Sequence, residues 1–244
     1  MTHLFRAARQ NRIFQDVVEQ IQEAIIDGQL KVGDRLPAER DLKELLQTSR
    51  STLREALRVL EQKGLIEIKL GTGGGAVVKT VSSDLVAESL DLLIRSHQVS
   101  LRHIAEFRER VEGDVVVLAT SRIKASDTRN LKTLLKEARK CVDRGAEAVS
   151  DFLTADKNIH LYFAKITGNP IYISILKTIH ENLRRYYDEF LMMEEPEMKE
   201  NLQDLADVVA AMVSGNAEKA GDIARTHVRR FNGYMEMRER QHKI

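Results

Sequence analysis

The sequence predicts a mainly α-helical protein made of two parts. The first is a small N-terminal part in which helices are followed by a β-hairpin, and the second is an all-α bundle of six or seven helices. Glycine marks the division, because seven of the 13 glycines lie before residue 80 and four of them fall within Gly71–Gly75. Two short β-rich runs flank that glycine stretch, and helical spacing of apolar residues dominates after residue 84.

The first predicted helix ends at Gly28, since glycine commonly follows a helix C-terminus. Its apolar residues recur at helical spacing: Phe14, Val17, Val18, Ile21, Ile25 and Ile26. An extended link then leads to Pro37, which suits the first turn of a second helix. We expect that helix to bury Leu42, Leu45 and Leu46.

A third helix is predicted to start after Ser49, a good N-cap residue, and to end at Gly64. Its inward face carries Leu53, Leu57 and Leu60. Residues 65–70, "LIEIKL", alternate as a strand, and residues 76–81, "AVVKTV", form a second β-rich run. The expected order is therefore three helices followed by a hairpin.

The glycine stretch "GTGGGAVVKT" also matches nucleotide-binding patterns, which we reject from its context. Gly71, Gly73 and Ala76 fit G-x-G-x-x-A, but a dinucleotide loop requires a helix after it, and a β-rich run follows here. A phosphate-binding P-loop requires glycine directly before its lysine, where Val78 stands. The glycines instead indicate a hairpin tip that can approach a sugar–phosphate backbone.

Two helices joined by a short turn and followed by a hairpin make a winged helix-turn-helix, which is typical of DNA binding. The third helix carries Arg50, Ser51, Thr52 and Arg54 in its first turns, where such helices enter a major groove. Arg40 on the preceding helix is placed to reach the same DNA backbone. The alternative is a solvated helix face whose arginines pair with nearby glutamates such as Glu61.

The stretch "IIDGQLKVGDRLPAERDLKELLQTSRSTLREALRVLEQKGLIEIKLGTGGGAVV" resembles the N-terminal signature of the GntR-type bacterial transcription regulators. The match is dense over about fifty residues, with Val32 in place of the usual proline and Thr48 in place of the usual valine. The resemblance implies that Arg40, Arg50 and Arg54 make the main DNA contacts and that Gly71 sits at the minor-groove tip. We place this DNA-binding domain at residues 1–80.

The second part, residues 84–240, is expected to form an all-helical effector-binding and dimerisation domain. Ser126 and Asn216 are the predicted N-caps, and Gly168 and Gly215 the predicted C-caps. The predicted helices span 84–96, 101–124, 126–143, 147–167, 170–193, 197–214 and 217–238.

The pieces "FRERVEGDVVVLAT", "DKNIHLYFAKITGNP" and "AMVSGNAEKAGDIARTHV" resemble the FCD domain of the FadR-type branch of the same family. This resemblance implies a homodimer on a palindromic operator of double-stranded DNA. It also implies a small effector, commonly a carboxylate, that changes DNA affinity. Most such regulators are repressors, and we expect a repressor here.

Asp156, His160 and His227 are the candidate metal ligands. Asp156 and His160 are four residues apart on an apolar helix face, and His227 lies on a similar face near the C-terminus. Unpaired burial of such groups is costly, so they require partners. In the resembled domain a metal is held by one Asp and three His, and the fourth position falls on Leu205, which cannot ligate. One zinc or nickel ion held by three ligands and a metal-free hydrogen-bonded network both remain open.

His180 is a candidate substitute for the missing ligand, although we expect it on the surface. Arg108 lies on the apolar stripe of its helix, where a buried guanidinium needs an anion. It is interpreted either as a clamp for the effector carboxylate or as the partner of Glu112 one turn away. Tyr162, Arg184 and Tyr187 are further candidates for lining the effector site.

The composition fits a DNA-binding regulator without requiring one. The net charge is +1, so DNA binding must come from local clusters of arginine and lysine. The sequence has no long apolar run for a membrane span, and its single cysteine, Cys141, suits the cytoplasm. The alternative function is a metal-dependent enzyme using Asp156, His160 and His227. We predict no enzyme, since no base or nucleophile motif accompanies those residues.

Overall fold

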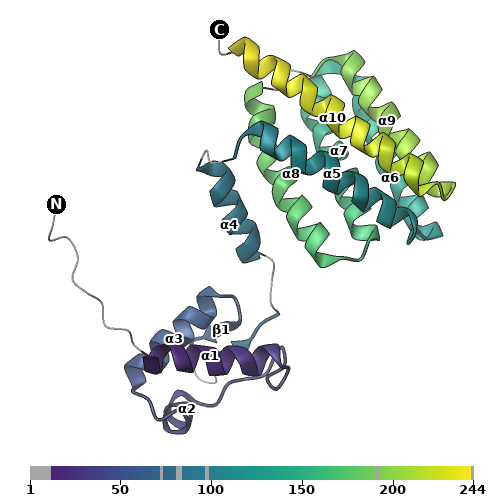
Figure 1. Ribbon diagram of the computed structural model, residues 1–244. Helices are drawn as coiled ribbons and strands as arrows, with labels where there is room; N and C mark the ends of the chain where they lie inside the picture. Colours follow the sequence, from purple (N-terminus) through teal and green to yellow (C-terminus); the bar gives the residue numbers. More distant parts are fainter. Residues whose placement is uncertain (1–11, 72–73, 81–83, 97–98, 191–192, 243–244) are drawn as a thin grey trace. The chain divides into compact units, whose positions relative to one another are not determined.

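The computed structural model describes residues 12–71, 74–80, 84–96, 99–190 and 193–242 (Figure 1). By its internal contacts the chain divides into two compact units, residues 1–85 and 86–244. The first unit contains the predicted helices and hairpin, and the second is wholly helical in the part that the structure describes. The mainly α-helical class predicted from the sequence is therefore confirmed.

The N-terminal unit is built from three helices and a two-stranded sheet. Helices α1 (Arg12–Ile26), α2 (Glu39–Leu45) and α3 (Arg50–Gln62) precede strands β1 (Ile66–Lys69) and β2 (Gly75–Val78). The strands pair antiparallel, with Ile66 opposite Val78 and Lys69 opposite Gly75. This is the predicted hairpin, and no helix follows its glycines, so the nucleotide-loop patterns are excluded by the fold.

One apolar core holds this unit together. The predicted inward residues Leu53, Leu57 and Leu60 of α3 are buried against Val17, Val18 and Ile21 of α1 and against Ile66 and Val78 of the hairpin. The prediction for Leu45 was wrong, because its side chain is 71% exposed. Helix α2 has only seven residues, and its buried seam passes through Leu42 and the half-buried Leu46, which leaves Leu45 at the edge.

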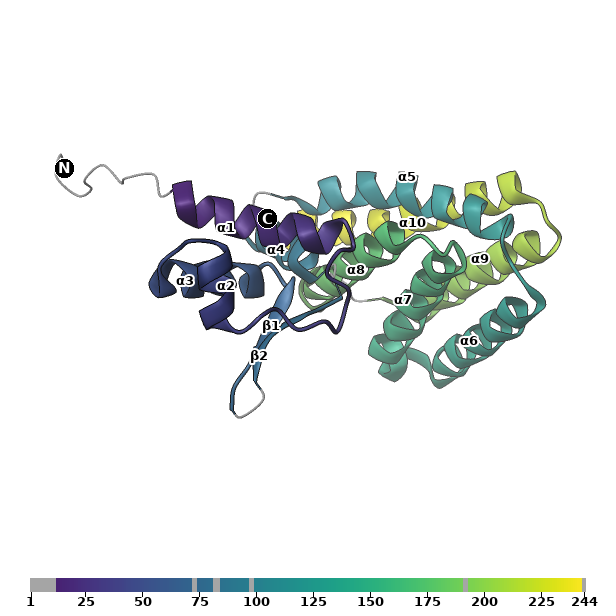
Figure 2. The same cartoon turned by 90° about the horizontal axis from the view of Figure 1, so that it is seen from below.

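The helical unit contains α4 (Asp84–Arg95), α5 (Leu101–Thr120), α6 (Ala125–Arg144) and a short 3₁₀ turn (Gly145–Ala148). It continues with α7 (Val149–Ile166), α8 (Pro170–Phe190), α9 (Glu195–Val213) and α10 (Ala217–His242). Figure 2 shows the C-terminal α10 running alongside α5 and α9, which its contacts confirm. Helix α7 packs between α6, α8 and α5, so its inward residues reach the middle of the bundle.

Helix ends in this unit follow local capping, and one predicted cap was wrong. Helix α5 ends at Thr120 rather than 124, and Ser126 lies inside α6 instead of capping it. Lys124 is the N-cap residue, and Asp127 in the first turn of α6 accepts a 2.9 Å hydrogen bond from the backbone N–H of Lys124. Asn216 caps α10 as predicted, because its side-chain oxygen accepts a hydrogen bond from the backbone N–H of Lys219.

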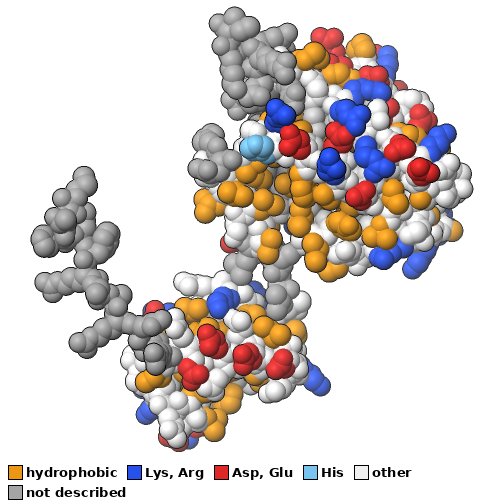
Figure 3. All heavy atoms as spheres, viewed as in Figure 1, with side chains coloured by type: hydrophobic (Ala, Val, Ile, Leu, Met, Phe, Trp, Pro, Cys, Tyr) orange, Lys and Arg blue, Asp and Glu red, His pale blue; other side chains and the backbone are white. Residues whose placement is uncertain are grey.

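An apolar groove lies on the helical unit between α4, α5 and α8. It encloses about 530 Å³ and is lined by aliphatic and aromatic side chains, including Leu90, Leu93, Ile104, Phe107 and Ile179. Figure 3 shows hydrophobic side chains gathered along the side of this unit where α4 and the start of α8 lie. No helix within the described ranges is both long enough and apolar enough to cross a membrane.

Candidate functional site

The first turn of α3 presents hydroxyl groups and an arginine to solvent. The side chain of Ser49 accepts a hydrogen bond from the N–H of Thr52, as an N-cap does, and lies within 2.9 Å of the hydroxyls of Ser51 and Thr52. Arg50 and Ser51 are exposed, whereas Leu53 behind them is fully buried. The buried stripe therefore fixes the helix with its N-terminal turn facing outward.

Arg54 lies one turn further along α3 and is fixed by a contact that the sequence did not reveal. Its Nε donates a 2.9 Å hydrogen bond to Glu39 at the start of α2. The side chain stays 58% exposed, so the pair orients the guanidinium without burying it. Arg54 therefore pairs with a glutamate, as the alternative interpretation proposed, but with Glu39 rather than Glu61, whose carboxylate accepts from the backbone N–H of Ile68 in the hairpin.

Arg40 and the hairpin complete this surface of the N-terminal unit. Arg40 is 81% exposed and contacts only the neighbouring Asp41 among the ion pairs described. Gly71 follows β1 with φ +97°, a conformation that favours glycine. A side chain at Gly74 would meet the Lys69 carbonyl oxygen at 2.2 Å, so glycine is required there by the tight turn. Residues 72–73 of the predicted tip lie outside the described residues.

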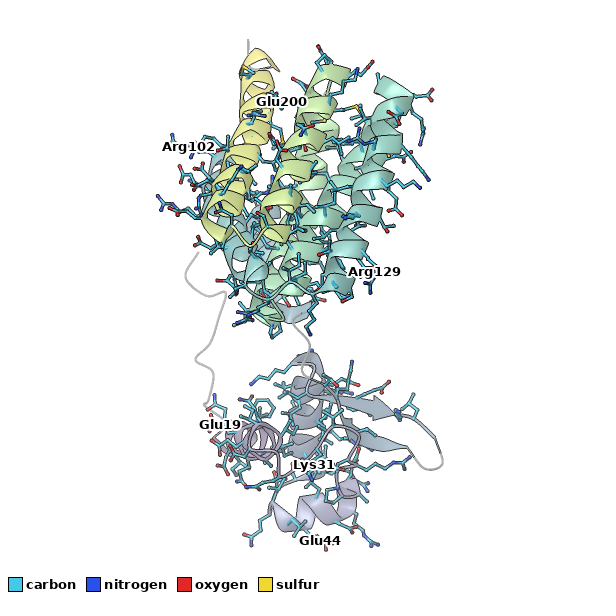
Figure 4. The ribbon with its side chains drawn as sticks, turned by 90° about the vertical axis from the view of Figure 1, so that its right-hand side faces the viewer. Glu19, Lys31, Glu44, Arg102, Arg129 and Glu200 are labelled. Carbon is cyan, nitrogen blue, oxygen red and sulfur yellow. The ribbon has the colours of Figure 1, made fainter. Side chains whose placement is uncertain are left out.

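A cluster of ionisable side chains lies buried inside the helical unit. Most charged side chains of this unit lie at its surface, and Arg102 and Arg129 point away from the bundle on opposite sides in Figure 4. The cluster is different, because its members are at most 3% exposed: Arg108, Glu112, Asp156, His160, His180 and His227. Burial of so many ionisable groups is costly unless they are paired with each other or with a ligand.

Asp156, His160 and His227 converge as the sequence predicted. Nε2 of His160 lies 3.1 Å from Nε2 of His227, and Oδ1 of Asp156 lies 3.8 Å and 3.6 Å from these two nitrogens. Ligands at about 2.0–2.1 Å from a tetrahedral ion lie about 3.3 Å apart, so three atoms at 3.1–3.8 Å match a metal triad. Asp156 Oδ1 is also buried without a hydrogen-bond partner within the described part of the chain.

Leu205 occupies the position where a fourth ligand was expected. It lies on α9 and is fully buried, and its aliphatic side chain cannot ligate a metal. Its neighbour Asp204 places Oδ2 3.6 Å from Nδ1 of His227, behind that ring. The residues present therefore fit a metal held by two imidazoles and one carboxylate, with one coordination position left for a further ligand.

His180 is not the surface residue that the sequence led us to expect. It is 2% exposed, and its Nε2 lies 3.3 Å from Oε1 of Glu112. The misprediction arose because α8 is covered on more than one side, which helical spacing alone does not show. His180 groups with Glu112 and His160 rather than with Asp156 and His227. It thus joins the cluster without replacing the missing ligand.

Arg108 is buried as predicted, and the anion that its guanidinium pairs with is a protein carboxylate. Its Nε donates to Oε1 of Glu112, and its NH1 donates a 3.5 Å hydrogen bond to the side chain of Asn232 on α10. The pairing with Glu112, which the sequence offered as the alternative, is the arrangement observed. A direct clamp on an effector carboxylate stays a prediction. Tyr162 instead bonds Asp127 and Asn130, and the side chains of Arg184 and Tyr187 lie outside the described residues.

The buried carboxylates of the cluster lie beside the Arg108 guanidinium and the histidine rings. Burial by itself raises the pKa of Glu112, but the Arg108 guanidinium and His160 hold that pKa well below its usual range. Burial lowers the pKa of His180 more than Glu112 raises it. For His227, burial lowers the pKa, but the Asp156 and Asp204 carboxylates outweigh it and raise the pKa to about 9. Asp204 is a site residue that sequence reasoning missed, and Glu112 was considered only as the partner of Arg108 and not as a neighbour of His160.

Comparisons with known proteins identify both units. Residues 14–78 match the model described as bacterial regulatory proteins, gntR family, and residues 103–230 match the FCD domain. The chain belongs to the GntR family of bacterial regulatory proteins. It carries the FCD domain in its helical unit, so the resemblance seen in the sequence is confirmed.

Two curated members of the GntR family show how far the similarity extends. The Uxu operon regulator of Haemophilus influenzae is 30% identical over 165 residues, covering 68% of this chain and 58% of that protein. The HTH-type transcriptional repressor NanR of Cronobacter sakazakii is 28% identical over 176 residues, covering 70% of this chain and 64% of that protein. The chain thus spans less than two thirds of the length of either relative.

A solved GntR structure supports the fold. The Streptococcus agalactiae GntR protein superimposes with a TM-score of 0.67 over 90% of this chain and 98% of its own, at 23% sequence identity. The family models and the names of the relatives support a DNA-binding transcription regulator and give no support to the metal-dependent enzyme considered from the sequence.

Proposed function

We propose that this GntR-family protein is a transcription repressor that binds a palindromic operator as a homodimer and responds to a small effector in its helical unit. The observation that carries this proposal is the exposed N-terminal turn of α3, backed by a buried leucine stripe, in a chain whose first unit matches the gntR model. A dimer presents two such turns, which suits two half-sites at a fixed spacing.

The DNA contacts are assigned to side chains that lie on or near the exposed turn. Arg50 reads a base edge in the major groove, while the hydroxyls of Ser51 and Thr52 bond bases or phosphates. Arg54, oriented by Glu39, and the exposed Arg40 contact the backbone. Gly71 lets the hairpin approach the minor groove without a side chain between them.

The effector site is assigned to the buried triad. Oδ1 of Asp156 and the Nε2 atoms of His160 and His227 would hold a zinc or nickel ion, because two imidazoles and a carboxylate suit either metal. Such an ion supplies a Lewis-acidic position for an anionic oxygen. Because Leu205 cannot ligate, one coordination position has no protein donor. That position favours an effector that carries a carboxylate. The chain's own part is to hold the three donor atoms in place and exclude bulk water.

The DNA assignment is tested with the Arg50→Ala variant on the DNA upstream of the protein's own coding region. We expect specific binding in a gel shift to be abolished, because each bidentate arginine contact contributes about 1–3 kcal/mol and a dimer forfeits two of them. Arg102→Ala, an exposed arginine on α5, is the matched control and should bind as the wild type does. Unchanged affinity in Arg50→Ala would refute the assignment of this turn to DNA.

The metal assignment is tested separately by measuring metal content after purification and dialysis against zinc. The wild type should retain about one ion per chain, and Asp156→Ala should retain much less, since only two ligands remain. Asp151→Ala, an exposed carboxylate at the start of the same helix, is the control. Equal zinc in Asp156→Ala and wild type would place the ion elsewhere.

A further inference from the structure

Two overlapping groups of side chains in the buried cluster have the composition of a metal site. One is Asp156, His160 and His227, and the other is Glu112, His160 and His180. His160 belongs to both, and its two ring nitrogens face different groups. Nε2 faces Asp156 and His227, whereas Nδ1 lies against Oε2 of Glu112. A neutral imidazole carries one proton, so the environment of Nδ1 decides which nitrogen is free to bind a cation.

The second group is unsuited to hold a cation, because its carboxylate already serves a guanidinium. Arg108 donates to Oε1 of Glu112, and both side chains are at most 2% exposed. A divalent ion at this carboxylate would lie close to the arginine charge in a poorly screened interior. The first group contains no arginine, and Oδ1 of Asp156 lies 3.8 Å and 3.6 Å from Nε2 of His160 and Nε2 of His227.

We propose that Glu112 is a positioning residue that fixes His160 for metal binding, and that Arg108 and His180 hold Glu112 in place. The inference rests on the proposed metal site and deepens it. The carboxylate against Nδ1 stabilises a proton on that nitrogen, which leaves the lone pair of Nε2 directed at Asp156 and His227. Carboxylates behind metal-bound histidines commonly set ring orientation and tautomer in this way.

Glu112 is itself restrained from three helices. Arg108 on the same helix donates to Oε1, and Nε2 of His180 on α8 lies 3.3 Å from that oxygen. Arg108 is in turn fixed by α10, through the side chain of Asn232 and through the Phe231 ring, whose centroid is 5.8 Å from the guanidinium carbon. The carboxylate therefore has little freedom to turn away from His160.

In this arrangement Arg108 and His180 act by holding Glu112, without touching an effector. A second carboxylate, Asp204, has the same relation to the triad as Glu112. Asp204 stands behind His227 as Glu112 stands behind His160, so each histidine of the triad has a carboxylate on the side away from Nε2. Such partners change metal affinity without ligating the ion.

The first test compares Glu112→Gln with Glu109→Gln, a carboxylate on the same helix that pairs with Arg229 outside the cluster. Zinc affinity is measured by competition with a chromophoric chelator. We expect Glu112→Gln to bind zinc about 10- to 100-fold more weakly, the range typical of removing such outer partners. Glu109→Gln should match the wild type. Equal affinity in a folded Glu112→Gln variant overturns the inference.

A second measurement needs no change at Glu112 and covers the case in which that variant fails to fold. Long-range ¹H–¹⁵N NMR of histidine rings reports which nitrogen carries the proton, and His160→Gln identifies the His160 signals. In wild-type protein treated with chelator, we expect His160 to carry its proton on Nδ1. With zinc added, the shift of Nε2 should change. A proton on Nε2, or zinc bound at Nδ1, overturns the inference.

The two proposals fail in different ways. If the wild type binds no zinc, the proposed metal site fails, yet the tautomer of His160 in metal-free protein still shows whether Glu112 fixes the ring. If zinc binds at Asp156 and His227 while neither the zinc affinity nor the position of the His160 proton depends on Glu112, the metal site stands and the positioning role falls.

Discussion

At the scale of single residues, the buried cluster is held together by compensation of charge. Glu112 is paired with Arg108, and Asp156 faces His227, whose pKa is raised to about 9. A buried charge whose partner is removed is strongly destabilising, whereas the intact set is tolerated. The cluster is therefore a specific arrangement in which single substitutions leave an unpaired group behind.

Protonation of His227 makes the stability of the metal-free protein depend on pH. The groups facing its ring are Asp156, Asp204 and His160, with Arg230 paired to Asp204. Because the pKa is raised from 6.5 to about 9 on folding, the stabilisation is fully present below 6.5 and is lost as pH rises through 9. In the presence of chelator, the urea concentration at the midpoint of unfolding should decrease as the pH is raised from 6.5 to 9. His227→Gln should remove most of that fall, and an equal fall in both proteins would contradict the pKa.

Leu205 offers a gain-of-ligand test of the metal site. Replacing this buried residue on α9 with histidine adds a fourth donor beside the triad, so zinc should bind at least about tenfold more tightly. Leu202→His, one turn earlier on the same helix and similarly buried, serves as the control for introducing a buried histidine. Competition with a chelator measures both. If the two variants bind zinc equally, α9 does not face the open coordination position.

At the scale of secondary-structure elements, the end of α3 that we propose to face DNA depends on its N-cap. Ser49 accepts from the N–H of Thr52 and contacts the hydroxyl of Ser51, so one side chain orders both the helix start and two groups assigned to DNA. Helix α2 contributes through Glu39, which orients Arg54. A surface ion pair of this kind adds little stability, and its effect here is to orient the Arg54 guanidinium.

Removing the cap should weaken both folding and DNA binding. Ser49→Ala is expected to destabilise the N-terminal unit by about 1 kcal/mol, the usual cost of removing an N-cap. Ser49→Thr retains the hydroxyl and should lie close to the wild type. Denaturant unfolding gives the stability, and a gel shift at a temperature where both variants are folded gives the affinity. A stable Ser49→Ala variant that binds DNA normally would show that the cap does not order the exposed turn.

At the scale of the whole molecule, the net charge of +1 leaves no general attraction to DNA. Binding must therefore come from local arginines presented twice by a dimer. In solution the protein should have twice its chain mass of 27.8 kDa by light scattering. A mass of one chain at the concentrations that bind DNA would contradict the dimer.

The salt dependence of binding tests both the proposed dimer and the side chains proposed to contact DNA. Removing one arginine that neutralises a phosphate reduces the slope of log affinity against log salt by about one. Arg40→Ala should therefore reduce the slope by about two on a two-fold symmetric operator, since both protomers carry the substitution. Arg129→Ala, exposed on α6, should leave the slope unchanged. A reduction of about one would indicate a single bound half-site.

The sequence by itself determined the features that depend on local periodicity and short signatures. Residues 49–62 show their cap, their buried leucine stripe and their exposed arginines in order, and the β-branched run after Gly75 showed that a strand follows the glycines. The spacing of Asp156 and His160 placed both on one helix face, because a turn of helix is about 3.6 residues. These properties are set within one or two turns of chain.

Only the tertiary structure decided what lies between helices. The burial of His180, the contact of Glu112 with His160, and the position of Asp204 behind His227 each involve residues on different helices. Helical spacing tells which residues share a face but not how many neighbours cover that face. The assignment of Glu112 and Arg108 therefore required the packing of α5, α7, α8 and α10, because the energy of a buried charge is set by groups that the chain brings together only on folding.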